Sequence, residues 1–151
     1  MKRELADGLS IRYAEGSESD ALFALAARSG HPVDLPMLEA LSIAGRGFVA
    51  VRDDTGEFVG VAAVGDIDGM MTVETLAVAP DARRQGVGSA LVTTVEEYGR
   101  WAYYASVLAV PQDAEATEFM FRRGYLALDE ARTPDAVARL GHGRPVVTKR
   151  L

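Results

Sequence analysis

One stretch decides the fold of this chain: Leu76-Ala-Val-Ala-Pro-Asp-Ala-Arg-Arg-Gln-Gly-Val-Gly-Ser-Ala-Leu91. Residues 72–78 are rich in β-branched and apolar side chains, which predicts a buried strand. Pro80 cannot donate a hydrogen bond to a neighbouring strand, so we expect the strand to end there. Apolar residues then recur at helical spacing from Val87 to Ala102, which predicts a helix. The stretch is therefore a strand, a short basic turn and the beginning of a helix.

The turn has the composition of an anion-binding loop. Arg83, Arg84 and Gln85 supply hydrogen-bond donors. Gly86 and Gly88 allow the backbone to turn tightly and to approach a ligand closely. The first N–H groups of a helix have no partner inside it, and the helix dipole adds partial positive charge, so a phosphate or pyrophosphate binds well there. The alternative is a turn that only connects the two elements and whose basic side chains are solvated.

Two common phosphate loops do not fit this turn. No Gly-Lys-Ser/Thr follows, which excludes a P-loop, and the glycine spacing differs from that of the dinucleotide fingerprint. The run instead resembles the acetyl-CoA loop of the GNAT family of N-acetyltransferases, whose pattern is Leu-x-Val-x-Pro-x-x-Arg-x-x-Gly-x-Gly. The chain carries every element of that pattern, at Leu76, Val78, Pro80, Arg83, Gly86 and Gly88.

Composition limits the class of protein. The 151 residues suit one domain with a core of its own, so we expect residues 1–151 to form a single domain. Apolar residues make up 48% of the chain, as in soluble globular proteins. The chain has no cysteine, which excludes disulfides, a thiolate nucleophile and a cysteine-based metal site, and we expect no metal.

Charge and the apolar runs indicate the compartment and the partners. No run is long enough for a membrane span, and the first residues lack the apolar core of a signal peptide. We therefore expect a cytoplasmic protein with no membrane partner. The net charge of −6 argues against nucleic acid as a partner. That charge serves solubility, or it lines an acidic cleft for a cationic amine.

Hydrophobic periodicity and turn residues predict the order of the other elements. The expected strands are residues 9–14, 48–52, 58–64, 71–79, 105–110, 125–128 and 145–150. The expected helices are residues 21–28, 35–44, 87–101, 114–123 and a short one within 133–140. Ser17 and the pair Ser19-Asp20 are candidate N-caps of the first helix. The resemblance implies an α/β GNAT fold: a mixed central sheet with a β-meander in its first half, splayed central strands and flanking helices.

A weaker part of the resemblance lies in the second half of the chain. Leu108-Ala-Val-Pro, then Ala116, and then Phe119-Met-Phe-Arg-Arg-Gly-Tyr125 are similar to the family's strand, helix and Gly-Phe/Tyr ending. The tail from Pro134 is similar to that of GNAT enzymes that acetylate amino acids and their analogues. The resemblance therefore implies acetyl transfer to a primary amine of a small molecule, with an amino acid or analogue as one candidate.

The resemblance also assigns roles to residues. Acetyl-CoA is the implied co-substrate, and the amine attacks its thioester directly. Backbone N–H groups from Arg84 to Ser89 hold the pyrophosphate, with charge added by the arginines. The pantetheine arm lies between the splayed strands 72–79 and 105–110, and the N–H of Leu76 or Val78 stabilises the oxyanion. The cofactor-binding residues implied are Leu76, Ala77, Val78, Arg83, Arg84, Gln85, Gly86, Val87, Gly88 and Ser89.

Glu74 is the candidate general base. It shares a strand with Leu76 and Val78 and, with a period of two residues, lies on the same face. It could instead bind a substrate cation or form a structural ion pair at the rim of the sheet. Some family members carry the carboxylate two residues earlier, where this chain has Thr72. Asp66 and Asp68 are expected at a solvated turn, His31 at the surface, and His142 in a mobile loop.

The usual general acid is missing. Many relatives carry Tyr four residues before the Gly of the Gly-Phe ending, but here that position is Met120, followed by Phe121. Neither donates a proton, so water or another tyrosine must protonate the thiolate, or the protein is slow or inactive. The other tyrosines to consider are Tyr103, Tyr104 and Tyr125, and we expect Tyr98, Trp101 and Tyr103 to belong to the core.

Three functions therefore remain open. The first is an acetyltransferase. The second is a CoA-binding protein without catalysis, used as a sensor or interaction module, which the missing tyrosine favours. The third is a nucleotide-phosphate binding module, which the loop alone would allow. GNAT domains often dimerise, so a homodimer is one assembly that the resemblance allows.

Overall fold

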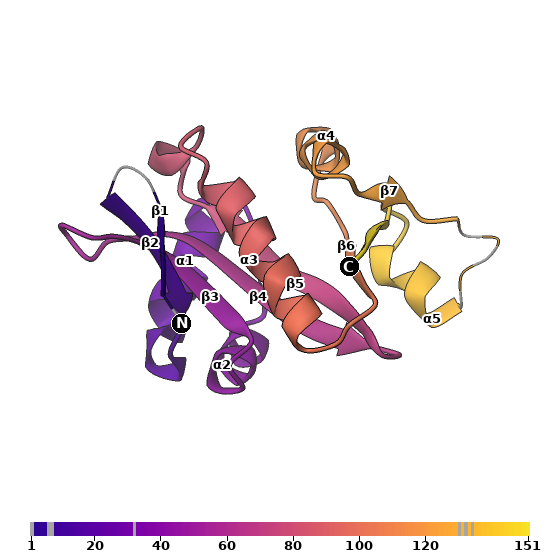
Figure 1. Ribbon diagram of the computed structural model, residues 1–151, viewed down its shortest axis with the longest axis horizontal. Helices are drawn as coiled ribbons and strands as arrows, with labels where there is room; N and C mark the ends of the chain where they lie inside the picture. Colours follow the sequence, from indigo (N-terminus) through magenta and orange to yellow (C-terminus); the bar gives the residue numbers. More distant parts are fainter. Residues whose placement is uncertain (1, 6–7, 32, 130, 132, 134) are drawn as a thin grey trace. The chain divides into compact units, whose positions relative to one another are not determined.

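A computed structural model describes residues 2–5, 8–31, 33–129, 131, 133 and 135–151. Over these residues the chain has an α/β fold with a mixed sheet of eight strands (Figure 1). The chain divides into two compact units. Unit 1 contains Met1–Gly65 and Glu74–Val95, and unit 2 contains Asp66–Val73 and Glu96–Leu151. Each unit is described by itself.

Antiparallel pairing builds the strands of unit 1. The strands β1 to β5 are neighbours in chain order, so the predicted β-meander is present. Antiparallel pairs join β1 to β2, β2 to β3 and β3 to β4. The bounds are Lys2–Leu5 for β1, Leu9–Tyr13 for β2, Gly47–Arg52 for β3, Phe58–Ile67 for β4 and Met70–Val78 for β5.

Helices pack on both faces of these strands. In β3, a Cβ added at Gly47 would lie 2.9 Å from Ser42 Oγ of α2 (Leu35–Ile43). In β4, a Cβ added at Gly60 would lie 2.9 Å from Val87 Cγ1 of α3 (Val87–Trp101). Gly47 pairs with Ala63, three residues from Gly60, so the two glycines face opposite sides of the sheet. α3 therefore lies on the face opposite to α2, and the glycines allow both helices to approach closely.

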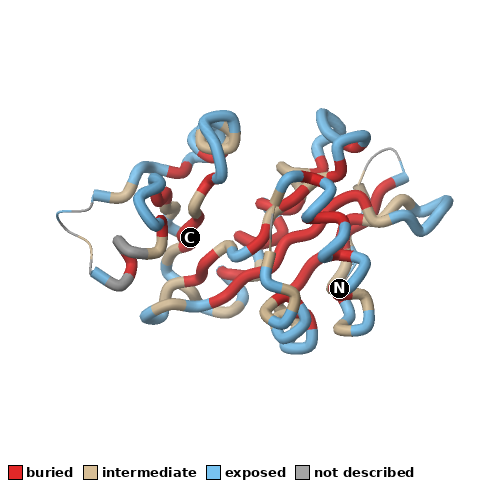
Figure 2. The backbone as a smooth tube through the Cα atoms, turned by 180° about the vertical axis from the view of Figure 1, so that it is seen from behind, coloured by how far each residue is buried: buried red, intermediate tan, exposed pale blue. Residues whose placement is uncertain are grey.

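Burial confirms the two-sided packing. Most of β3 and β4 is buried (Figure 2). The helix α1 (Ser19–Arg28) buries Leu22, Leu25 and Ala26, and α3 buries Val87, Leu91 and other residues of its apolar face. Strands that are covered on both faces read as nearly continuous apolar runs, which is what Phe58–Ile67 is.

Unit 2 contains the remaining elements. The first part of β5 pairs in parallel with β6 (Ser106–Ala109), from Met71–Val107 to Val73–Ala109. β8 (Val147–Arg150) is antiparallel to both β6 and β7 (Leu126–Ala127). α4 spans Ala114–Arg122 and α5 spans Asp135–Ala138. The Asp113 carboxylate caps α4 by accepting a hydrogen bond from the Ala116 N–H at 2.8 Å.

The predicted elements are present, with boundaries within about three residues. β1 was not expected, because its residues Lys-Arg-Glu-Leu are mostly charged and the strand is formed by pairing with β2 rather than by burial. The N-cap prediction was wrong: a short 3-10 helix, Gly16–Glu18, precedes α1, and Ser19 is the first residue of α1. Its hydroxyl donates to Gly16 O at 2.7 Å. The single domain over residues 1–151 stays a prediction.

Candidate functional site

The predicted anion loop lies between β5 and α3, inside unit 1. β5 ends at Val78, and a short 3-10 helix, Pro80–Ala82, follows. The end of the strand is anchored, because Ala79 N donates to Val59 O of β4 at 2.8 Å. α3 then begins at Val87, so the strand, turn and helix predicted from the sequence are all present.

The backbone of the turn takes two left-handed conformations. Arg84 has a φ of 64° and Gly86 a φ of 79°. A Cβ added at Gly86 would meet nothing within 4 Å, so the φ angle, and not lack of space, requires glycine there. Arg84 carries the strain of a left-handed residue with a side chain, about 1–2 kcal/mol. Non-glycine residues in this region are uncommon and are often found at functional sites.

The turn delivers the chain directly into the N-terminus of α3. The first hydrogen bond of the helix runs from Ala90 N to Gly86 O at 3.0 Å. The N–H groups that precede this bond lie at the positive end of the helix dipole, where an anion is stabilised. Arg83, Arg84 and Gln85 are exposed beside them. The turn therefore combines helix N–H groups with cationic side chains.

Arg83 has a partner that the sequence did not reveal. Its guanidinium Nη2 donates to Ser29 O, at the end of α1, at 3.2 Å. The two residues are 54 positions apart in the chain, so no local pattern could have predicted the contact.

The two faces of β5 differ in exposure. Thr75, Ala77 and Ala79 are buried, whereas Leu76 and Val78 are half-buried. Glu74 shares their face, as predicted, and is exposed. The Ala77 side chain faces the core, so among the implied cofactor residues Ala77 offers only its backbone. A strand with two half-buried apolar side chains and one accessible carboxylate can contact a ligand on that face.

The position of the missing tyrosine lies in unit 2 and is apolar. Met120 is buried in α4, and Phe121 is exposed. The Met120 carbonyl accepts hydrogen bonds from Arg123 N and Tyr125 N. Neither the Met120 side chain nor the Phe121 side chain can supply a proton.

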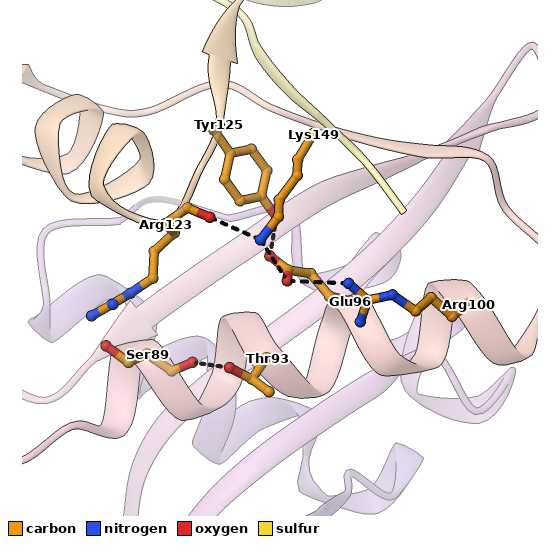
Figure 3. A network of polar contacts seen from close by, with 7 residues as sticks. All are labelled: Ser89, Thr93, Glu96, Arg100, Arg123, Tyr125 and Lys149. Atoms are coloured by element: carbon orange, nitrogen blue, oxygen red, sulfur yellow. Dashed lines mark hydrogen bonds and ion pairs between the residues drawn. The ribbon is translucent and has the colours of Figure 1, made fainter.

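Tyr125 is held in a buried polar network (Figure 3). Its hydroxyl donates to Glu96 Oε2 at 3.0 Å, and Lys149 Nζ lies 3.0 Å from Glu96 Oε1. Lys149 also donates to Arg123 O at 2.8 Å. Burial, with the charge and hydrogen bond of Glu96, raises the pKa of Tyr125 far above its ordinary value. Tyr125 is therefore a poor proton donor and a structural residue.

Tyr98, Tyr103 and Tyr104 lie elsewhere in unit 2. The Tyr104 hydroxyl donates to Asp66 Oδ2 at 2.8 Å. The predicted aromatic core was wrong for Trp101, which is 74% exposed, and for Tyr103, which is 95% exposed, while Tyr98 is half-buried. Trp101 lies two residues beyond the buried Gly99, about 200° around α3, so it faces away from the helix face that packs inward.

The sequence did contain a signal for the network that we missed. Glu96 lies between Val95 and Gly99 on the buried face of α3, where an acidic residue is rare without a partner. Asp66 and Asp68 are exposed, as expected, although Asp66 lies in β4 and not in a turn. His142 is exposed and His31 is half-buried. In the part of the chain that the structure describes, no group of three or more His, Cys, Asp or Glu residues could hold a metal ion. No described helix is long and apolar enough to cross a bilayer.

Comparisons with known proteins agree on the fold. The sequence model of the acetyltransferase (GNAT) family matches residues 15–125. No curated protein matches the chain. Among solved structures, a Mycobacterium tuberculosis protein in complex with CoA is 21% identical, with a TM-score of 0.77, over 93% of this chain and 98% of that one.

Two further similar structures are those of enzymes named for their activity. The Neisseria gonorrhoeae N-acetylglutamate synthase, complexed with coenzyme A and N-acetyl-glutamate, is 21% identical with a TM-score of 0.76, over 95% of this chain. The present chain spans only 35% of that protein's length. The Escherichia coli ribosomal-protein-S18-alanine N-acetyltransferase is 17% identical with a TM-score of 0.72, over 94% of this chain and 93% of that one.

Proposed function

The chain belongs to the acetyltransferase (GNAT) family, and from this premise we propose that it transfers the acetyl group of acetyl-CoA to a primary amine of a small molecule. The observation that carries the proposal is the turn between β5 and α3. Its left-handed Arg84 and Gly86 lead into a helix N-terminus beside exposed cationic side chains. The family match, the sequence motif and the backbone conformation all support CoA binding at this turn.

In this proposal the turn holds the pyrophosphate. Backbone N–H groups from Arg84 to Ser89 donate to it, because the N-terminus of α3 stabilises negative charge. Gln85, Val87 and Gly88 contribute through the same stretch of backbone. The donor set of backbone amides and the exposed Arg84 side chain suits a doubly charged phosphate bridge, which is the group that CoA would place there.

The exposed face of β5 positions the reacting groups. Leu76 and Val78 present backbone groups and half-buried side chains to the pantetheine arm. Acetyl-CoA supplies the acetyl group as a thioester. The N–H of Leu76 or Val78 stabilises the negative charge that develops on the thioester oxygen. Holding the amine and the thioester together contributes a large part of the rate.

Glu74 is the proposed general base. It is accessible on the same face of β5, and it takes the proton of the substrate ammonium directly or through one water. The neutral amine then forms the N–C bond as the C–S bond breaks. Because Met120 cannot donate and Tyr125 is held by Glu96, the proton for the departing thiolate comes from solvent.

The acceptor is the finer part of the proposal. A net charge of −6 favours a cationic amine over an anionic one. An amino acid or analogue is the first class to test. A homodimer stays a prediction.

A specific observation favours a second candidate, a CoA-binding protein without catalysis. The place of the family's proton donor is a buried methionine, Met120. Slow protonation of the thiolate would reduce turnover, and its absence would abolish turnover while binding stays intact.

Ligand-induced stabilisation tests the binding step that both candidates share. A ligand at about 100 times its Kd adds roughly 2.7 kcal/mol to the free energy of unfolding. We expect CoA and acetyl-CoA to raise the Tm, and ATP at the same concentration to raise it only weakly. No Tm shift at millimolar CoA would overturn both candidates. An equal shift with ATP would favour a general nucleotide-phosphate module.

A further inference from the structure

Arg83 joins two parts of unit 1 that are distant in sequence. It follows the 3-10 helix Pro80–Ala82 directly and opens the proposed pyrophosphate turn. Its side chain does not extend only into solvent: Nη2 donates to Ser29 O at 3.2 Å. Ser29 is the C-cap of α1 and is buried. The contact therefore links the turn to the end of a packed helix.

The end of α1 has a carbonyl left for this contact. Gly30 is left-handed, with a φ of 82°. Gly30 N donates to Ala27 O at 3.1 Å and His31 N donates to Ala26 O at 2.8 Å. These two bonds form a Schellman motif, which satisfies the carbonyls of Ala26 and Ala27. The Ser29 carbonyl lies beyond them, and Arg83 supplies its donor.

Electrostatics favours the same arrangement. The C-terminal end of a helix carries partial negative charge, so a guanidinium placed there is stabilised. α3 presents the opposite, positive end to the turn. The Arg83 side chain therefore lies at the negative end of α1, and the backbone amides lie at the positive end of α3.

The neighbouring residue gives a reason for such an anchor. Arg84 holds a left-handed conformation with a φ of 64°. A strained residue persists only where its surroundings fix it. The Arg83 side chain and the first turn of α3, closed by Ala90 N to Gly86 O, hold the backbone on both sides of Arg84.

We propose that Arg83 is a positioning residue that fastens the cofactor turn to the C-terminal end of α1, and that it keeps this contact when CoA is bound. Binding at the turn then stabilises the end of α1, and loss of the anchor weakens binding without removing a phosphate ligand. The coupling between CoA binding and the end of α1 rests on the proposed function. The anchor itself does not.

The first experiment uses the protein without CoA. Hydrogen exchange of the Gly30 and His31 amides reports the stability of the Schellman motif. We expect Arg83→Gln to speed their exchange by about threefold to tenfold, from the loss of one charge-assisted hydrogen bond and one helix-end charge. Arg84→Gln removes the same charge from the adjacent position, without the Ser29 contact, and serves as the matched control. Equal exchange in the two variants would overturn the anchor.

The second experiment adds saturating CoA. In the wild type, CoA should slow exchange at Gly30 and His31, and in Arg83→Gln this slowing should be lost. Arg83→Lys keeps a charged donor and should restore part of it. Faster exchange in the wild type on CoA binding would mean that the guanidinium moves from Ser29 to the phosphates, and it would overturn the proposal. If the wild type binds no CoA, the proposed function and the coupling both fail, while the first experiment still decides the anchor.

Discussion

Backbone conformation makes Gly86 different from an ordinary turn residue. Its φ of 79° is one that residues with a side chain rarely adopt, although the space around Gly86 is open. Arg84 bears a similar φ with a side chain in place. A turn that keeps one strained residue next to a glycine places its N–H groups in a defined direction, which is what a phosphate site needs.

Gly86→Ala should cost about 1–2 kcal/mol of stability, because alanine must adopt the left-handed conformation. The displaced N–H groups should also weaken CoA binding by about tenfold or more. Gly69→Ala is the matched control, since Gly69 has a φ of 78° and equally open space, in another turn. Its Tm should fall by a similar amount while the calorimetric Kd for CoA stays constant. Equal affinity in both variants would mean that Gly86 serves the turn alone.

Glu74→Gln keeps the shape of the side chain and removes its basicity. If Glu74 is the base, kcat should fall by about 10²–10⁴-fold with the Kd for CoA nearly unchanged. Steady-state kinetics with acetyl-CoA measure this, with Glu4→Gln on β1 as an exposed control. A raised KM for the amine with kcat intact would assign substrate binding to Glu74 instead.

Single residues were predictable only where a local pattern carries the information. The alternation along β5 placed Glu74 on the face of Leu76 and Val78, and the structure confirms it. The contact of Arg83 with Ser29 could not be predicted, because it depends on how α1 packs against the rest of unit 1.

The elements α3 and β8 show how a buried charge network is maintained. Glu96 of α3 is buried, and it contacts Lys149 of β8 and Tyr125, which directly precedes β7. Lys149 also caps the end of α4 through Arg123 O. A buried carboxylate is stable there only because these donors surround it.

Lys149→Met should destabilise the protein by about 2–3 kcal/mol, because it removes the nearer cation of the buried Glu96 and leaves only the exposed Arg100, 4.0 Å away. The value is below that of a fully buried pair because the lysine itself is partly exposed. Arg150→Met, the next residue on β8 and exposed, should change stability by less than about 0.5 kcal/mol. Urea unfolding compares the two. Equal effects would show that the network contributes little.

Alkaline pH should weaken the same network. The pKa of Tyr125 is raised in the folded protein, so the folded state keeps the proton that the unfolded state loses above about pH 10. The stabilisation from Tyr125 is thus complete below the unfolded pKa and declines as pH rises past it. The free energy of unfolding should fall more steeply between about pH 9 and 11 in the wild type than in Tyr125→Phe. Parallel curves would contradict the assignment.

Elements were predicted well where hydrophobic periodicity was strong. The bounds of α3 agree with the predicted helix over residues 87–101. β1 was missed because pairing with β2, rather than its own pattern, makes it a strand. The aromatic residues at the end of α3 were placed in the core because of their type, but the helix rotation turns Trp101 outward.

The whole molecule combines a GNAT family match with an apolar residue at the family's usual acid position. The fold followed from the chain's order of strands and helices. Activity does not follow from fold alone, because function depends on the groups at the site. In the proposed mechanism the turn after β5 binds CoA, and solvent protonates the thiolate because Met120 cannot.

Release of thiol from acetyl-CoA, measured with a thiol reagent against a panel of primary amines, tests the central claim most directly. The protein has no cysteine, so every thiol detected is CoA. The account predicts release that depends on enzyme and amine, saturates in both substrates and falls sharply in Glu74→Gln. A protein that binds acetyl-CoA yet releases no thiol with any amine would contradict the acetyltransferase and leave the non-catalytic CoA-binding protein.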